Sequence, residues 1–332
     1  MDPLTHTATG LFLSRAGLNR WTPQAAPILM LAANAPDIDI VTVSGGSLNY
    51  LHFHRHLTHS LAAMPVMAIM TVLLVRLVSR KPVAWGGAFW AALIAVASHL
   101  LLDFTNVYGI RLLLPFSAEW LRLDLTGIFD FWIWSAFLLA LVIPFLARLV
   151  NSEITSGKSR RPLHYGRGAA WFALFFVLLY DGGRAVLHSR AVAILESRLY
   201  QGETAARVLA VPGLNPLQWR GVVETTQFYL VSDVDSTADF HPERGIVFYK
   251  AAPDPALDAA RRTATFQTFL QFNQFPLWRV SPAGQPDDAK RVDLFDLRFG
   301  SPNQAGFKAS ALVDPRGDVL STSFQFGRPP GR

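Results

Sequence analysis

Residues 83–102 read VAWGGAFWAALIAVASHLLL and form the clearest membrane-spanning segment of the chain. Only Ser98 and His99 interrupt about twenty apolar positions, and a helix of that length rises ~30 Å, the thickness of a bilayer core. The chain has 332 residues, of which 51% are hydrophobic and 16% are charged. This composition excludes a disordered protein, because it supplies enough apolar surface for burial.

Three further apolar runs predict that the N-terminal part is an α-helical membrane domain with about four transmembrane helices. They are residues 61–78, 128–147 and 169–188. The apolar stretch Ile28–Ala35 is too short to span a bilayer, so we expect N-terminal interfacial helices before the first span. We expect no removable signal peptide, because the N-terminus lacks a charged region followed by a cleavable apolar core.

The rest of the chain reads like a small α+β soluble domain, which predicts two domains, residues 1–188 and 189–332. Residues 189–209 and 255–272 are typical of helices, and the motif DPRGD at 314–318 predicts a hairpin turn. Strands are expected at Trp219–Ser232, Gly245–Lys250, Asp293–Phe299, Phe307–Val313 and Val319–Phe326. This domain contains no Gly-rich phosphate loop and no nucleophile elbow.

The distribution of charge predicts a multi-pass protein of the inner membrane. Residues 1–188 carry 14 Lys and Arg against 9 Asp and Glu, so the net charge of +6 comes mostly from this part and indicates topology rather than nucleic-acid binding. The loops that join the first to the second span and the third to the fourth are basic. Their cations are Arg76, Arg80, Lys81, Arg148, Lys158, Arg160, Arg161 and Arg167. We therefore expect these loops in the cytoplasm, and residues 1–60, 103–127 and 189–332 on the periplasmic side.

Histidine and aspartate side chains gather on that periplasmic side. The chain has no cysteine, and His and Asp are the residues that hold zinc or another divalent metal when thiolates are absent. His99 and Asp103 are four residues apart and share one helical face, whereas Asp37 and Asp39 point the same way if their turn is extended. The candidate histidines are His6, His52, His54, His56, His59 and His99.

The roles within such a cluster stay open at the level of sequence. Asp37, Asp39 and Asp103 could each be a metal ligand or a general base, because carboxylates serve in both roles. Arg55 could anchor the protein to lipid headgroups or stabilise negative charge on a phosphate or an oxyanion.

Four motifs together resemble a family of bacterial inner-membrane proteins, the YdjM-like or YbcI-like metal-dependent hydrolases. The motifs are His6 with Gly10, PDID at 36–39, HRHLTHS at 54–60 and HLLLD at 99–103. LDLTGIFD at 123–130 adds the acidic residues Asp124 and Asp130, and NPLQW at 215–219 resembles a sequence of the longer members. The resemblance implies a metal site with the ligands His6, Asp37, Asp39, His54, His59, His99 and Asp103.

The predicted function is a membrane-bound, metal-dependent hydrolase with zinc as the expected metal. A divalent ion lowers the pKa of bound water from ~15.7 to ~7, which makes it a nucleophile. A site at the bilayer surface favours a phosphoester or ester of a lipid or lipid-linked substrate, with Arg55 and Asp103 as the expected catalytic side chains. Membrane lipids are thus the expected partners, and nucleic acid is not. The alternative is a non-enzymatic membrane protein with a structural metal and a partner-binding tail.

Overall fold

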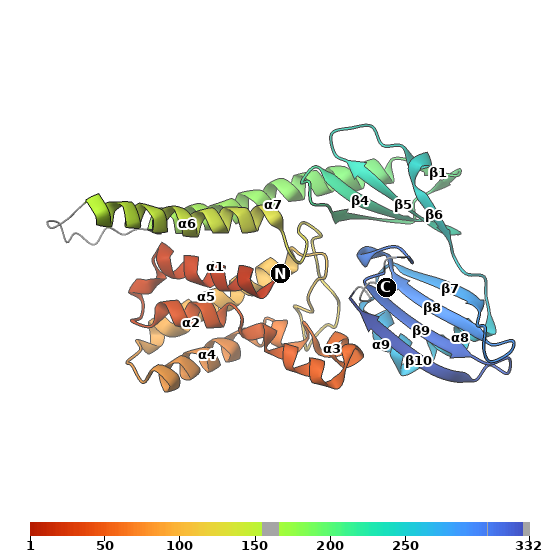
Figure 1. Ribbon diagram of the computed structural model, residues 1–332, viewed down its shortest axis with the longest axis horizontal. Helices are drawn as coiled ribbons and strands as arrows, with labels where there is room; N and C mark the ends of the chain where they lie inside the picture. The colour runs from red at the N-terminus through yellow and green to blue at the C-terminus, as the bar shows by residue number, and fades with distance from the viewer. Residues whose placement is uncertain (155–165, 304, 328–332) are drawn as a thin grey trace. The chain divides into compact units, whose positions relative to one another are not determined.

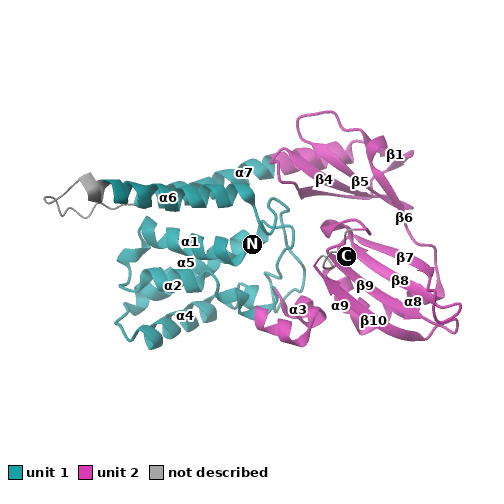
Figure 2. Cartoon of the chain, in the orientation of Figure 1, with its two compact units in different colours: residues 1–39, 55–186 teal, residues 40–54, 187–332 magenta. Residues whose placement is uncertain are grey.

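A computed structural model describes residues 1–154, 166–303 and 305–327 (Figure 1). The chain divides into two units, coloured separately in Figure 2. Unit 1 consists of Met1–Asp39 and Arg55–Val186, and unit 2 of Ile40–His54 and Leu187–Arg332. The sequence did not indicate that residues 40–54 group with the C-terminal part, and the division into domains 1–188 and 189–332 stays a prediction.

The described secondary-structure elements of unit 1 are α-helices and 3-10 helices. Its helices are α1 (Pro3–Ala16), α2 (Ala25–Ala32), α4 (Met64–Ser79), α5 (Trp85–Phe104), α6 (Phe131–Ile154) and α7 (Arg167–Glu196), and α7 continues into unit 2. The short 3-10 helices are η1 (Leu18–Arg20), η2 (Ala35–Gly45) and η3 (Leu57–His59), of which η2 also crosses into unit 2. A helix-rich N-terminal part is therefore confirmed.

The start of α1 is set by its first three residues. The Asp2 carboxylate accepts hydrogen bonds from the backbone N–H groups of Leu4 and Thr5, both at 3.1 Å, and Pro3 occupies the first helical position. These are the preferred ways to satisfy donors that have no partner inside a helix. The cap places His6 in the first turn of α1, with its side chain fully buried.

Small residues let the helices of unit 1 approach closely. A Cβ atom added to Gly10 would lie 2.4 Å from the carbonyl oxygen of Leu29, so only glycine allows α1 this close to α2. Four buried alanines of α5 pack in the same core as α2 and α4: Ala88, Ala91, Ala92 and Ala95. Interfaces rich in small residues are typical of helices packed within membranes.

Among the described residues, three helices are long and apolar enough to span a membrane, namely α5, α6 and α7. The number rises to five if two bent pairs each form one span: Ala25–Ala32 with Ala35–Gly45, at 46°, and Ser47–His59 with Met64–Ser79, at 90°. The predicted span at 61–78 corresponds to the 16-residue helix α4. This helix is long and apolar enough to span a membrane only together with Ser47–His59. Membrane helices are confirmed, and the count of four stays a prediction.

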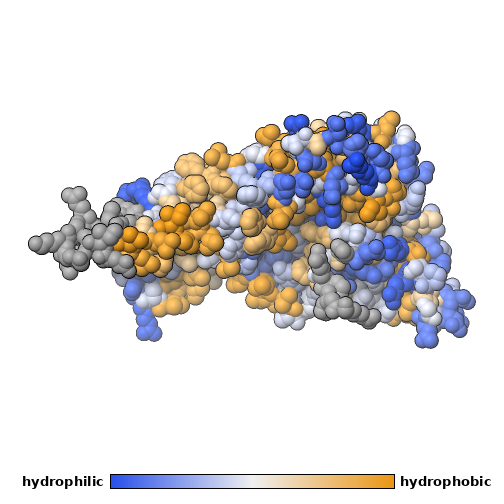
Figure 3. All heavy atoms as spheres, turned by 45° about the horizontal axis from the view of Figure 1, so that its top comes forward, coloured by the Kyte–Doolittle hydropathy of each residue, from blue (hydrophilic) through white to orange (hydrophobic). Residues whose placement is uncertain are grey.

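The surface of unit 1 agrees with a lipid environment. Figure 3 shows hydrophobic side chains, in orange, gathered over its helices, and α6 and α7 expose large apolar residues such as Phe145 and Leu179. The basic residues Lys158, Arg160 and Arg161, which entered the prediction of topology, lie outside the described residues.

Unit 2 is rich in antiparallel sheet. Its strands are β1 (Leu199–Tyr200), β2 (Glu203–Thr204), β3 (Arg207–Pro212), β4 (Gln218–Glu224), β5 (Phe228–Asp235), β6 (Ile246–Tyr249), β7 (Pro276–Pro282), β8 (Lys290–Asp296), β9 (Phe307–Val313) and β10 (Val319–Phe326). The orders are β3-β4-β5-β6 and β10-β9-β8-β7, and β1 pairs with β2. Its helices are α3 (Ser47–Phe53), α8 (Pro255–Arg261) and α9 (Ala264–Phe272), with 3-10 turns η4 (Pro242–Arg244) and η5 (Leu297–Phe299).

The predicted elements of unit 2 are partly right. The hairpin at 314–318 joins β9 to β10, and its Gly317 has φ +91°, a conformation that favours glycine. The predicted strand Trp219–Ser232 is two strands, because the chain turns between β4 and β5. The helix predicted over 189–209 ends at Glu196, and β1, β2 and the start of β3 occupy the rest of that range. The buried residues Leu209 and Ala210 of β3 pair with β4.

Candidate metal site

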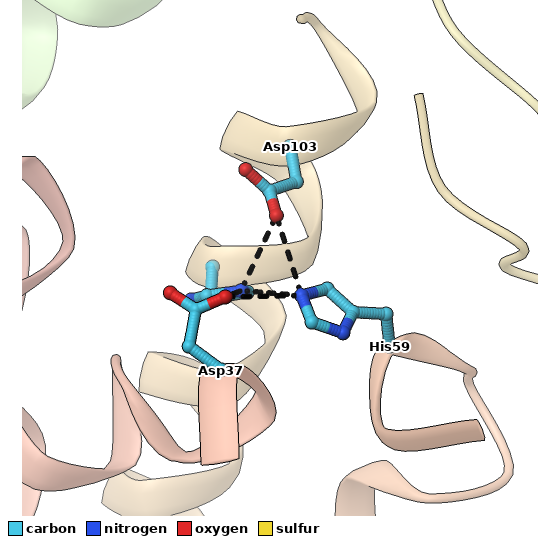
Figure 4. Close-up of side chains that lie close together, drawn as sticks. Asp37, His59 and Asp103 are labelled. Carbon is cyan, nitrogen blue, oxygen red and sulfur yellow. Dashed lines mark hydrogen bonds and ion pairs between the residues drawn. The ribbon is translucent and has the colours of Figure 1, made fainter. Parts of the chain in front are cut away.

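Four side chains from three segments of unit 1 meet in one place. Asp37 comes from η2, His59 from the end of η3, and His99 and Asp103 from α5. Each offers one ligand atom, and these atoms all lie within 4.8 Å of one another. Figure 4 shows Asp37, His59 and Asp103 pointing toward one another from their separate segments. His99 and Asp103 thus share one face of α5, as their spacing predicts.

The distances between the four donor atoms resemble a coordination shell. His59 Nε2 lies 3.1 Å from His99 Nε2, 3.4 Å from Asp37 Oδ1 and 3.4 Å from Asp103 Oδ2. His99 Nε2 lies 3.4 Å from Asp103 Oδ2 and 3.7 Å from Asp37 Oδ1. Ligands ~2.0–2.1 Å from a tetrahedral zinc ion lie roughly 3.3 Å apart. The two imidazoles and two carboxylates therefore fit a divalent metal.

Both imidazoles are oriented by hydrogen bonds on the side away from the cluster. His99 Nδ1 lies 2.7 Å from the carbonyl oxygen of Ala33, and a carbonyl can only accept, so Nδ1 carries the proton. His59 Nδ1 lies 3.3 Å from Asp39 Oδ2 and 3.1 Å from Thr58 Oγ1. These contacts leave the lone pair of each Nε2 directed at the cluster, the arrangement that metal-bound histidines use.

Asp39 supports the cluster from outside. Its Oδ2 accepts a hydrogen bond from the Arg55 backbone N–H at 2.8 Å and another from Thr58 Oγ1 at 3.2 Å. Asp37 and Asp39 would point the same way in an extended turn, but η2 is helical and sends the two carboxylates to opposite nitrogens of His59. Asp37 therefore lies beside Nε2 of His59, the candidate ligand nitrogen, and Asp39 lies beside Nδ1 of the same ring.

We expect Asp39→Asn to weaken metal binding by about 10- to 100-fold, the usual cost of losing a partner outside the coordination shell. The amide cannot stabilise the His59 Nδ1 proton as a carboxylate does, so the ring loses both orientation and basicity. Metal titration of the purified protein measures the affinity. Asp233→Asn is the control, because Asp233 is an exposed acid of β5. An unchanged affinity in the Asp39 variant would contradict this role.

Asp103 and Arg55 form a buried ion pair at the edge of the cluster. Arg55 Nη2 donates to Asp103 Oδ1 at 2.9 Å, and Nη1 donates to the Gly109 carbonyl at 3.1 Å. The guanidinium also lies 4.7 Å above the ring of Tyr108. The structure thus places the Arg55 cation against a carboxylate of the protein itself, a contact that neither sequence-based alternative for Arg55 included.

His6 stacks on His99 with ring centroids 3.8 Å apart, and its Nε2 lies 3.5 Å from Asp103 Oδ1. Neither ring nitrogen of His6 has a hydrogen-bond partner among the described residues. Burial lowers the pKa of His6 well below its usual range, so the ring is neutral at pH 7. The Met1 amino group also contacts Asp103 Oδ1. His6 thus borders the cluster without being one of the four.

Three other predicted residues are not among the four of this cluster. His54 belongs to unit 2, and its ring stacks on Tyr50 with centroids 4.4 Å apart. Asp130 caps α6, accepting from the backbone of Trp132 at 3.0 Å, and its other oxygen accepts from Tyr180 at 3.1 Å. Asp124 is ion-paired with Arg122. The two acidic residues of LDLTGIFD therefore have structural partners.

Sequence reasoning assigned no role to three groups that hold the site: the Thr58 hydroxyl and the carbonyls of Ala33 and Gly109. Thr58 belongs to the motif HRHLTHS and directly precedes His59, so its contact with that histidine could have been predicted from the sequence. The two carbonyls could not be predicted from residue types, because every residue has a backbone carbonyl. No comparable group of metal ligands lies in the described part of residues 187–332.

Comparison with known proteins places the chain among membrane proteins. No solved structure matches it. The uncharacterized protein YfhP of Bacillus subtilis (strain 168) is 25% identical over 322 residues, which cover 93% of this chain and 90% of that protein. The model of the family described as YdjM inner membrane protein matches residues 1–193, more than half of the chain, including all four residues of the cluster. The chain therefore belongs to the YdjM inner membrane protein family.

Proposed function

We propose that this protein is a membrane-bound, metal-dependent hydrolase that acts on a phosphoester or ester of a lipid or lipid-linked substrate. One observation carries the proposal: two imidazole nitrogens and two carboxylate oxygens, all within 4.8 Å of one another, lie within the helical unit that contains the candidate membrane spans. Ionisable residues are costly near a membrane, and they are retained there mostly for function.

The residues that would hold the ion are Asp37, His59, His99 and Asp103. Two imidazoles with two carboxylates suit zinc, which is the metal we propose. When bound, the ion polarises an ester or phosphoryl oxygen and supplies a water nucleophile at neutral pH. His6 and Arg55 are both buried, so they would exclude water from the side of the cluster that they border.

Exposure decides from which side a substrate reaches the cluster. The side chains of His59, His99 and Asp103 are 0% exposed, whereas that of Asp37 is 19% exposed. We therefore propose that water and substrate approach the cluster along Asp37, its one partly exposed side chain.

Apolar residues beside the ligands favour a lipid substrate. Ile38 follows Asp37, and Leu61 lies two residues after His59. These two side chains are 60% and 52% exposed. Exposed apolar side chains beside a polar cluster suit a molecule with an acyl chain and a charged head.

One observation favours the second candidate, a structural metal in a non-enzymatic membrane protein with a partner-binding tail. Four protein ligands can complete a tetrahedral shell, and a closed shell is typical of structural zinc. The discriminating property is an open coordination position, which a catalytic ion requires. Partial exposure of Asp37 supports the catalytic candidate, because it gives water access to one member of the cluster.

The test combines metal analysis with hydrolysis by the full chain in detergent. We expect bound zinc and hydrolysis of either phosphatidic acid in mixed micelles or a p-nitrophenyl acyl ester. His59→Ala should lower metal content and rate more than about 100-fold, since even outer partners contribute 10- to 100-fold. His52→Ala is the control, because His52 is outside the four-residue cluster. Zinc-loaded protein without activity on the whole panel would instead support the structural candidate.

We further propose that the cluster and residues 189–332 are periplasmic and that loop 79–82 is cytoplasmic. The support is the positive charge of Arg76, Arg80 and Lys81 around that loop. The Cys-free chain allows a direct measurement with Lys81→Cys and Gly284→Cys, and the added Cβ meets no atom within 4 Å at Gly284. An impermeant thiol reagent added to intact cells should label only the second variant. Labelling of both would refute this topology.

A further inference from the structure

Residues 40–54, here called the excursion, join two stretches of unit 1 that carry the cluster. Asp37 and Asp39 lie just before the excursion, and Arg55 and His59 follow it, whereas the excursion itself groups with unit 2 (Figure 2). The Arg55 backbone N–H donates to Asp39 Oδ2 at 2.8 Å and closes the excursion at its base. Unit 2 therefore contains the segment on whose two ends candidate ligands lie.

The two helices of the excursion are not stable by their own length. The 3-10 helix η2 has 11 residues, and 3-10 helices longer than about four residues are uncommon because their hydrogen bonds are poorly aligned. α3 has 7 residues, and an isolated helix shorter than ~12–15 residues is marginal in water. Asn49 Nδ2 of α3 donates to the Thr42 carbonyl of η2 at 2.8 Å and ties the two together. Their conformation therefore depends on what they pack against.

Unit 2 supplies this packing through α9 and β10, which α3 contacts. The buried residue of α3 is Leu51, which is 1% exposed. Ser47 Oγ donates to the carbonyl of Phe324 at 3.2 Å. The Tyr50 ring meets Phe326 edge to face, with centroids 5.5 Å apart. Phe324 and Phe326 both belong to β10, so α3 is docked on this strand.

We propose that docking of α3 in unit 2 raises the affinity of the cluster for its metal, so that unit 2 acts as an intramolecular effector of the metal site. The proposal rests on the metal binding stated under the proposed function. Metal binding must bring Asp37 and His59 together, and residues 38–58 separate them. Closing a flexible loop of this length costs about 100-fold in the equilibrium constant, since the entropic cost grows as (3/2)RT ln n. When α3 is docked, most of this loop is already ordered, so metal binding meets less of that cost.

The coupling can be measured without any variant, because the effect of docking on metal binding is reciprocal. Zinc must stabilise docked α3 by the same factor by which docking raises zinc affinity. Hydrogen–deuterium exchange of the full chain in detergent, with and without saturating zinc, measures this factor. We expect zinc to slow the exchange of the α3 backbone amides by about 10- to 100-fold.

Helix α8 is the matched control for the exchange measurement. It also has 7 residues and belongs to unit 2, but no residue of the four-residue cluster flanks it. We expect its exchange to be unchanged by zinc. If zinc binds but slows the exchange of both helices equally, or of neither, the proposal is wrong.

Leu51→Asp tests the same link from unit 2. A carboxylate at this buried position undocks α3, and we expect zinc affinity in equilibrium dialysis to fall by about 10- to 100-fold. Leu199→Asp is the control, because Leu199 is also in unit 2 but is 63% exposed. Ser47→Ala removes only the hydrogen bond to Phe324, so it should keep the fold and lower zinc affinity by a smaller factor.

The outcomes separate this proposal from the proposed function. Fast exchange of α3 in Leu51→Asp together with unchanged zinc affinity would overturn the coupling and leave metal binding intact. Failure of the unchanged chain to bind zinc would instead defeat the proposed function itself.

Discussion

The Asp103→Asn variant is expected to lose metal binding more than any other single variant of the chain. Asp103 Oδ2 is a corner of the donor set, and Oδ1 is the acceptor for Arg55, so one substitution removes both a ligand charge and the partner of a buried cation. Loss of outer partners alone costs about 10- to 100-fold in metal affinity, and we expect a larger loss here.

Equilibrium dialysis with radioactive zinc measures this effect in the detergent-purified chain. Glu119→Gln is the control, because Glu119 is an exposed acid of the same unit and the substitution removes the same charge. Helix content by circular dichroism separates loss of the ligand from loss of the fold. If the variant keeps its fold and binds zinc with an affinity within threefold of the unchanged protein, Asp103 is not a metal ligand.

The largest expected effect on stability lies in unit 2, at the buried ion pair of Asp296 and Arg298. Both side chains are 0% exposed, and Arg298 Nη2 donates to Asp296 at 2.6 Å and to the Phe272 carbonyl at 2.7 Å. Arg298→Met keeps much of the packing but leaves a buried carboxylate without its cation. We expect a loss of about 3–5 kcal/mol in the free energy of unfolding, the usual cost of breaking such a pair.

Denaturant unfolding of the full chain, followed by the near-ultraviolet signal of the tryptophans, measures this change. Lys290→Met is the matched control: Lys290 pairs with Asp254 at 2.7 Å but is 47% exposed, so we expect a loss below ~1 kcal/mol. The double variant Asp296→Asn with Arg298→Met should be more stable than Arg298→Met alone, because no buried charge remains. Equal losses for Arg298 and Lys290 would contradict the argument.

Helical spans were readable from the sequence because a bilayer requires about twenty consecutive apolar residues, and such a run needs no information from elsewhere in the chain. The same holds for the hairpin at 314–318, where Gly317 supplies the positive φ of the turn. Strand β7 was missed, because its burial depends on its pairing with β8. Likewise, residues 40–54 read as part of the membrane domain until their grouping with unit 2 was known.

For the candidate site, the sequence by itself determined the residue types and one local geometry. The spacing of His99 and Asp103 places both on one face of a helix, since a turn has ~3.6 residues. The absence of cysteine restricted the ligands to imidazoles and carboxylates.

Only the tertiary structure decided which members of that long list meet. It brought Asp37 and His59 to α5 and directed Arg55 to one oxygen of Asp103. These contacts join residues up to 66 positions apart, as between His99 and the carbonyl of Ala33. No local pattern encodes them, because they follow from how α1, α2 and α5 pack through small residues such as Gly10.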